Sequence, residues 1–297
     1  MEKRIKKNIF LVFGCVLAIS GCKKNTFVPQ QFEPGVEYDD VYLLMGQSNA
    51  SGVSPYSFLE SSEPALFQKY SVGNDKVKIT FDEVSQIENN FVDTKFGQGH
   101  SVEFFGPEIG MAEVFSNVYD TCYIVKASLS GSCLQTQYVD KNGNKYEYYN
   151  RFISFIKNQV QSLENLRKKP RIRGVFWMQG ESDSVNDMWF SYEQAEQHFY
   201  DYLLQDLSNW IYDHFNFVDA YISTKSLHWP NPRELNAQKQ NFCNSNDHCY
   251  CIKTNGEDAS AISLDLKSET GEGEDYAHYD SRSMLLLGKT AGNYLMK

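Results

Sequence analysis

The sequence predicts an α/β protein, a three-layer α/β/α sandwich built on a central, mainly parallel sheet of about five strands. Runs of nearly continuous apolar, β-rich residues recur along the chain, and such runs are typical of strands that are covered on both faces. Segments with apolar residues at helical spacing lie between these runs, which favours parallel strands joined by helices. The chain has 297 residues, 41% of them hydrophobic, which is enough to bury one large core.

The predicted elements follow in chain order from the same pattern, within a domain that we place at residues 39–297. Strands are expected at 41–45, 122–127, 174–178 and 217–223, with a weaker one at 262–266. Helices are expected at 107–116, 146–166, 189–215 and 281–296. Residues 53–101 have no counterpart in a minimal alternation of strand and helix, and because they are rich in phenylalanine we expect them to pack over the ligand cleft.

The first 38 residues precede this domain and are typical of an exported protein. Four cations come before a short apolar run at 9–20, in the order of a signal peptide. The tetrad Ile19-Ser-Gly-Cys22 resembles the bacterial lipobox, which implies that residues 1–21 are removed and that Cys22 carries a lipid anchor. Residues 22–38 are polar and are expected to form a tether. We therefore expect a lipoprotein of the bacterial cell envelope, either periplasmic or surface-exposed.

Charge and hydropathy argue against nucleic-acid binding and against a membrane-spanning protein. The chain has 28 basic and 38 acidic residues and a net charge of −10. A run of phosphates would find no complementary surface, so nucleic acid is not an expected partner. No stretch reaches the roughly 20 apolar residues that a spanning helix needs, so we expect no membrane-crossing segment.

Five cysteines remain after the lipobox, and export would place them where disulfides persist. We expect disulfides among them, with the pairing left open, at Cys122, Cys133, Cys243, Cys249 and Cys251. The segment 243–251 also contains His248, but its spacing matches no common zinc-ligand pattern. We therefore expect a disulfide that cross-links this loop, and no metal site.

Polar turns follow three of the predicted strands. They are Gly46-Gln-Ser-Asn49, Ser128-Leu-Ser-Gly-Ser132 and Gln179-Gly-Glu-Ser-Asp183. In open parallel sheets, ligands bind outside the carboxyl ends of the strands. We therefore expect the three turns to meet at one edge of the sheet and to form the site.

Ser48 is the candidate nucleophile, because it comes directly after a buried strand with Gly46 before it. A serine hydroxyl needs a base that removes its proton, and the base needs a third group to hold it. Asp275-Tyr-Ala-His278 supplies both, since its three-residue offset lets the carboxylate reach one ring nitrogen while the other faces Ser48. Asp280 is the alternative acid. The remaining histidines lack an acid at this close offset before a final helix: His100, His198, His214, His228 and His248.

Four motifs, taken in order, resemble the SGNH/GDSL hydrolase superfamily and its flavodoxin-like fold: Met45-Gly-Gln-Ser-Asn49, Gly106-Pro-Glu108, Trp177-Met-Gln-Gly-Glu-Ser-Asp183 and Asp275-x-x-His278. Within it, the chain resembles the sialate O-acetylesterase group and the sixth carbohydrate esterase family, which includes acetylxylan esterases. The resemblance covers roughly residues 39–296. It implies a cofactor-free serine esterase that removes acetyl groups from sialic acid or from plant or host polysaccharide, so the expected partner is an acetylated carbohydrate.

The resemblance also implies a role for each site residue. Ser48 and Gly131 would donate backbone N–H groups to the oxyanion, and Gln179 its side-chain amide. Hydrogen bonds from three further residues would support the site: Asn49, Glu181 and Asp183. The family usually has two glycines in the second turn, whereas Ser130 stands at the first of these positions, which bears on the shape of the acyl pocket.

Two alternatives are open at this stage. An α/β-hydrolase is suggested by Gly46-Gln-Ser48, but its nucleophile elbow requires glycine where Ala50 stands. A catalytically inactive, glycan-binding lipoprotein on the same scaffold is the other. Labelling by a serine-reactive fluorophosphonate distinguishes it from an esterase. The acetylated sugar and the oligomeric state stay undetermined.

Overall fold

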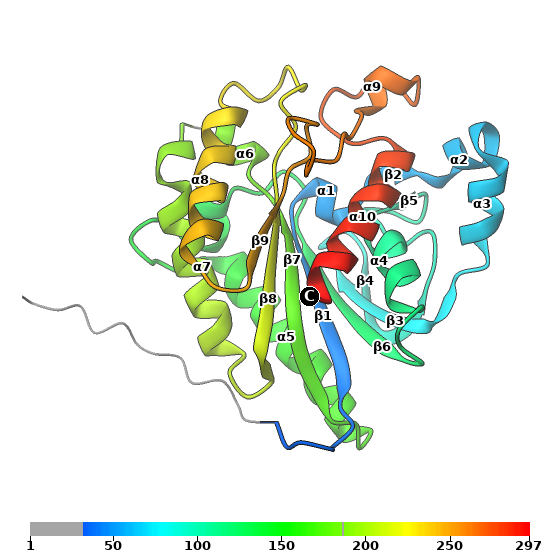
Figure 1. Ribbon diagram of the computed structural model, residues 1–297, viewed down its shortest axis with the longest axis vertical. Coiled ribbons are helices and arrows are strands. Elements are labelled where there is room, and N and C mark those ends of the chain that lie inside the picture. Colours follow the sequence, from blue (N-terminus) through cyan, green and yellow to red (C-terminus); the bar gives the residue numbers. More distant parts are fainter. Residues whose placement is uncertain (1–31, 186) are drawn as a thin grey trace, which may run out of the picture.

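The most apolar runs of the sequence form the middle of the sheet. Strand β1 (Asp39–Gly46) lies between β6 (Cys122–Ser128) and β7 (Pro170–Met178) and pairs in parallel with both. Figure 1 shows helices on both sides of this sheet in a computed structural model that describes residues 32–185 and 187–297. The predicted three-layer α/β/α fold is confirmed. The signal segment 1–21, Cys22 and residues 22–31 of the expected tether lie outside the described residues.

The sheet has seven strands in the order β4-β3-β6-β1-β7-β8-β9, not about five. The further strands are β3 (Asn74–Asp82), β4 (Ile87–Thr94), β8 (Ile211–Ala220) and β9 (Cys249–Ile252). Only β4 runs antiparallel to its neighbour. Strand β4 has a polar sequence because it forms an exposed edge, and β9 has only four residues, so neither carries the apolar signal of a central strand.

Alternate residues of β1 enter two separate cores. Val41 and Leu43 pack on one face with residues of α5 (Glu147–Asn165), α7 (Tyr192–Asp206) and α8 (Pro232–Ser245). Tyr42 and Leu44 pack on the other face with α4 (Glu108–Phe115) and α10 (Ser281–Leu295). The shorter elements are α1 (Ser48–Ser51), β2 (Ser54–Pro55), α2 (Tyr56–Ser62), α3 (Pro64–Ser71), β5 (Phe104–Phe105), a π-helical turn (Leu134–Tyr138), α6 (Glu181–Val185), a 3₁₀ turn (Trp189–Ser191) and α9 (Lys267–Thr270). Among the described residues, no helix combines the length and apolar character that a membrane crossing requires.

Two predicted elements differ from the structure. The helix expected at 189–215 ends at Asp206, because the chain from Ile211 onward pairs with β7 as β8. The strand expected at 262–266 is a loop with isolated antiparallel bridges, and β9 takes the sheet position beside β8. Leu264 and Leu266 are buried in the core all the same, so their hydrophobicity reflects packing rather than sheet pairing.

Residues 53–101 mostly extend the sheet and its flank instead of covering a cleft. They form α2, α3, β3 and β4, and the rings of Tyr56, Phe67 and Phe96 stack on one another in a separate aromatic cluster. Only the end of the segment approaches the turn after β1, where the N–H of His100 donates to the carbonyl of Gly52 over 2.8 Å.

The expected disulfides are not present among the described residues, since all five cysteines there are free. Cys133 packs beside Met188, with the two sulfur atoms 3.4 Å apart. Cys243 lies on α8, opposite the edge strand that carries Cys249 and Cys251, and its thiol contacts both of theirs. The prediction was wrong for Cys133 because its side chain faces a methionine instead of another cysteine.

Two glycines bring α4 and α10 into close contact, and α10 begins three residues after His278. A Cβ on Gly288 would lie 2.1 Å from the carbonyl oxygen of Pro107, and one on Gly110 would lie 2.3 Å from that of Leu285. We expect Gly288→Ala to lower the free energy of unfolding by about 1–3 kcal/mol, because the helices must move apart. Urea titration measures this, with the exposed Asn293→Ala on the same helix as the control. Equal stability of the two variants would contradict the prediction.

Candidate active site

Ser48 stands at a sharp exit from the central strand. Strand β1 ends at Gly46, and α1 begins at Ser48. Gly46 has a φ of +145°, and a Cβ there would lie 2.0 Å from the carbonyl oxygen of Met178, so only glycine fits. The Ser48 N–H is the first of the helix and therefore has no partner within it. The turn thus presents a hydroxyl and a backbone N–H together.

The structure brings Ser48, His278 and Asp275 into one hydrogen-bonded chain. The Oγ of Ser48 lies 2.9 Å from Nε2 of His278, and Nδ1 of His278 lies 2.7 Å from Oδ2 of Asp275. The other carboxylate oxygen accepts the backbone N–H groups of Ala277 and His278, which fixes its orientation. Asp280, the alternative acid, instead accepts the N–H of Ser283 and caps α10. Asp275 is therefore the carboxylate that holds the imidazole.

The pKa of Asp275 lies well below the usual range of an aspartate. Partial burial is the largest single influence on this pKa and acts to raise it. The hydrogen bond and charge of His278, the N–H of Ala277 and the charge of Lys267 together outweigh burial and lower the pKa. An ionised Asp275 accepts a hydrogen bond from a protonated Nδ1. The unprotonated Nε2 then accepts the hydrogen bond from the Ser48 hydroxyl. This is the arrangement in which an imidazole acts as a general base.

Asn49 links the nucleophile turn to two neighbouring segments. Its Nδ2 donates to Oε1 of Glu181 over 2.9 Å, and its Oδ1 accepts the N–H of Tyr279 over 3.3 Å. Glu181 is buried at the start of α6, and burial raises its pKa. These contacts hold Ser48 and the segment after His278 in register, and a supporting role for Asn49 and Glu181 stays a prediction.

Gln179 is expected to donate its side-chain amide to the oxyanion, and in the structure this amide is paired within the protein. The side chain is fully buried, and its Nε2 donates to Oδ2 of Asp183 over 2.7 Å and to the carbonyl of Ser132 over 3.0 Å. Its Oε1 accepts the hydroxyl of Tyr192. With both amide hydrogens engaged in this way, Gln179 joins the second and third turns together.

Gly131 is placed beside the nucleophile turn, as expected. The turn that carries it is anchored by the N–H of Leu129, which donates to the carbonyl of Gly46 over 3.1 Å. Gly131 has a φ of +71°, is exposed, and its N–H makes no hydrogen bond within the described part of the chain. A Cβ at this position would meet nothing within 4 Å, so the space beside it is open. The N–H is free to receive a ligand oxygen.

Lys126 is a buried cation beside α1 that is not among the predicted site residues. Its ammonium donates to the carbonyl of Ser51 over 2.6 Å, to that of Gln98 over 2.7 Å and to Glu108 over 3.0 Å, and lies 3.2 Å from Glu83. Because Ser51 is the last residue of α1, this lysine holds the far end of the nucleophile helix. A signal was present, since Lys126 is the one charged residue in the apolar run of β6.

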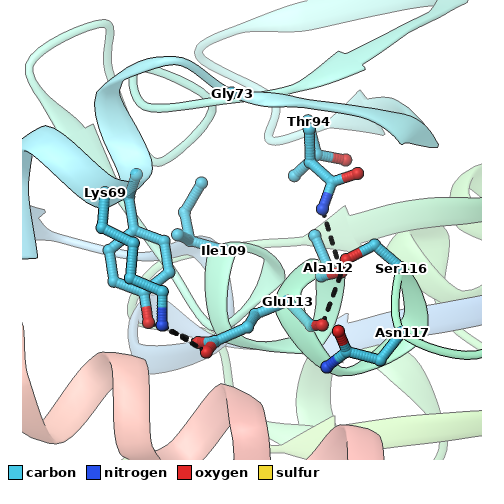
Figure 2. A pocket seen from close by; sticks show the side chains of 10 residues that line it. Lys69, Gly73, Thr94, Ile109, Ala112, Glu113, Ser116 and Asn117 are labelled. Atoms are coloured by element: carbon cyan, nitrogen blue, oxygen red, sulfur yellow. Dashed lines mark hydrogen bonds and ion pairs between the residues drawn. The ribbon is translucent and has the colours of Figure 1, made fainter.

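A cavity of about 380 Å³ lies apart from these residues, between α3, α4 and the edge of the sheet. Figure 2 shows the ammonium of Lys69 in contact with the carboxylate of Glu113, and both residues line this cavity. Its charged groups neutralise one another, so it offers no evident chemistry. Within the described ranges, no three His, Cys, Asp or Glu side chains are grouped to hold a metal ion.

Comparison with known proteins places this site in a family context. The sequence model of the family described as "carbohydrate esterase, sialic acid-specific acetylesterase" matches residues 38–296. No curated protein matches the chain.

Three solved structures share the fold. A protein from Arabidopsis thaliana superposes with a TM-score of 0.61 at 16% identity, covering 88% of this chain and 99% of its own. NanS gives 0.61 at 15% identity, covering 87% and 97%. A carbohydrate acetylesterase from Xanthomonas citri gives 0.52 at 13% identity, covering 86% of this chain and 55% of its own. At these identities the likeness establishes the architecture alone.

Proposed function

Because the chain belongs to the carbohydrate esterase family of sialic acid-specific acetylesterases, we propose that it removes acetyl groups from carbohydrate with Ser48 as nucleophile, His278 as base and Asp275 as its acid partner. The observation that carries the assignment is the continuous hydrogen-bonded chain from Ser48 through His278 to Asp275, with distances of 2.9 Å and 2.7 Å. A hydroxyl, an imidazole and an ionised carboxylate in this order form the arrangement that activates serine.

The proposed reaction has two steps. In the first, Nε2 of His278 takes the proton of Ser48 as Oγ attacks the acetyl carbonyl carbon, and the tetrahedral intermediate collapses as the protonated imidazole gives that proton to the departing sugar oxygen. Acetyl-Ser48 and a free sugar hydroxyl result. In the second, His278 takes a proton from water, the hydroxide attacks the acetyl group, and the proton returns to Oγ as acetate leaves. Asp275 stays ionised and stabilises the imidazolium in both steps.

Two backbone donors support the oxyanion in this proposal. The N–H of Ser48 is free at the start of α1, and the N–H of Gly131 is unpaired among the described residues. Each such donor typically contributes about 10²-fold to 10³-fold to the rate. Gln179 supports them indirectly, because it joins the turn of Gly131 to the turn of Glu181 through Ser132 and Asp183.

The experiment is acetate release from a panel of acetylated sialic acids, xylan fragments and other O-acetylated glycans. We expect release from at least one member, together with fluorophosphonate labelling of the native protein at the Ser48 peptide, read by mass spectrometry. Absence of both would favour a glycan-binding protein that has lost activity. The hydrogen-bonded chain of Ser48, His278 and Asp275 does not support that alternative.

We also propose, from the lipobox alone, that Cys22 anchors the enzyme to a membrane of the cell envelope.

A further inference from the structure

Lys267 shares a carboxylate oxygen with the imidazole of His278. Its ammonium lies 3.1 Å from Oδ2 of Asp275, the same oxygen that Nδ1 of His278 contacts at 2.7 Å. The lysine is 7% exposed, so water does little to screen it. A buried cation therefore contacts the acid of the proposed triad directly.

Lys267 also connects the segments that carry the three triad residues. Its ammonium donates to the carbonyl of Val53 over 2.6 Å, just past the end of α1, and its backbone N–H donates to the carbonyl of His278 over 3.0 Å. Gly52, beside Val53, is in turn tied to Ser48, because its N–H donates to the Ser48 carbonyl. One side chain thus joins the nucleophile segment to the acid and base segment.

We propose that Lys267 is a positioning residue. It orients Asp275 and reduces the electrostatic stabilisation that this carboxylate gives to the protonated form of His278. The inference rests on the proposed function. A cation beside the carboxylate offsets part of its charge, so an imidazolium at His278 gains less from Asp275. The same cation contributes to keeping the pKa of Asp275 low.

The charged groups that face His278 come from three segments. Asp275 lies on its own loop, Lys267 on α9, and Glu181 on α6 interacts with His278 electrostatically. Ser48, on α1, is neutral. Among the described residues, removing the ammonium leaves the carboxyl groups of Asp275 and Glu181 as the charged neighbours of the imidazole, and both stabilise an imidazolium.

The test is the pH dependence of kcat/KM for an activated acetyl ester, measured on the full chain with Lys267→Met and Lys267→Gln. We expect the acidic limb of the profile to move to higher pH by about one unit relative to the wild type, the lower end of the shift that a nearby charge produces. Lys267→Arg keeps the charge, and its acidic limb is expected to move by less than about half of the shift seen in the Met and Gln variants. Lys225→Met is the matched control, because Lys225 pairs with Asp265 and with Glu269 of α9 and does not touch the triad.

The outcomes separate this inference from the proposed function. Hydrolysis by the wild type and its loss in Ser48→Ala test the function first, independently of Lys267. An unshifted limb in a folded Met or Gln variant overturns the positioning role, even where kcat falls. If both variants lose their native circular dichroism, Lys267 is a structural anchor only, and the proposal is equally overturned.

Discussion

Replacing Ser48 with alanine is expected to lower kcat for an activated acetyl ester by about 10⁶-fold while the protein stays folded. The substitution removes one hydroxyl whose side-chain contact is His278, so the reaction loses its nucleophile and the packing of α1 changes little. Steady-state kinetics measures the rate, and circular dichroism confirms the fold. The proposed acetyl-enzyme cannot form, so a fluorophosphonate should no longer label the protein.

The matched control is Ser162→Ala on α5, whose hydroxyl donates to the carbonyl of Gln159 and makes no contact with the triad. This variant is expected to retain the kcat of the wild type. Turnover by Ser48→Ala at the rate of the control would exclude Ser48 as nucleophile, and the oxyanion geometry at Gly131 would then need another explanation.

Replacing Lys126 with methionine is expected to cause the largest loss of stability, about 3–5 kcal/mol in the free energy of unfolding. The lysine and its carboxylate partners, Glu83 and Glu108, have no exposed side-chain surface. Methionine fills a similar volume but leaves two buried carboxyl groups and the carbonyl of Ser51 without their donor. Urea titration at neutral pH measures the change.

The pH range of this effect follows from the pKa of Lys126. Burial is the largest influence and acts to lower it, but the charges and hydrogen bonds of Glu108 and Glu83 outweigh burial and raise it above its usual value. A lysine with a raised pKa stabilises the fold fully below the unfolded value of about 10.4, and the contribution disappears as pH rises through the folded value. The measurement at neutral pH therefore records the whole effect.

An exposed ion pair provides the comparison for Lys126. Lys78 pairs with Asp93 at the surface of β3, and Lys78→Met is expected to cost less than about 1 kcal/mol because water solvates both groups. If Lys126→Met were as stable as Lys78→Met, the buried network would contribute nothing beyond packing. The two lysines thus separate the effect of burial from that of charge.

Local patterns in the sequence were sufficient where a feature depends on neighbours along the chain. The apolar runs of β1, β6 and β7 predict their strands closely, because a strand covered on both faces needs an apolar residue at nearly every position. The three-residue offset of Asp275 and His278 is of the same kind, since both side chains come from one short loop. Strand β4 lacks such a signal because its polar residues face solvent at the sheet edge.

By itself, the sequence determined the α/β class and the central strands, because the burial pattern of a strand is set within a few residues. It made Ser48, Asp275 and His278 candidates through their motifs. Only the tertiary structure decided that the Gln179 amide donates to Asp183 and to the carbonyl of Ser132. The same holds for the contacts of the Lys267 ammonium with Asp275 and Val53. These contacts join segments from different strands and loops. Which side chains meet there depends on how the whole sheet and its connections pack, and no local spacing encodes that.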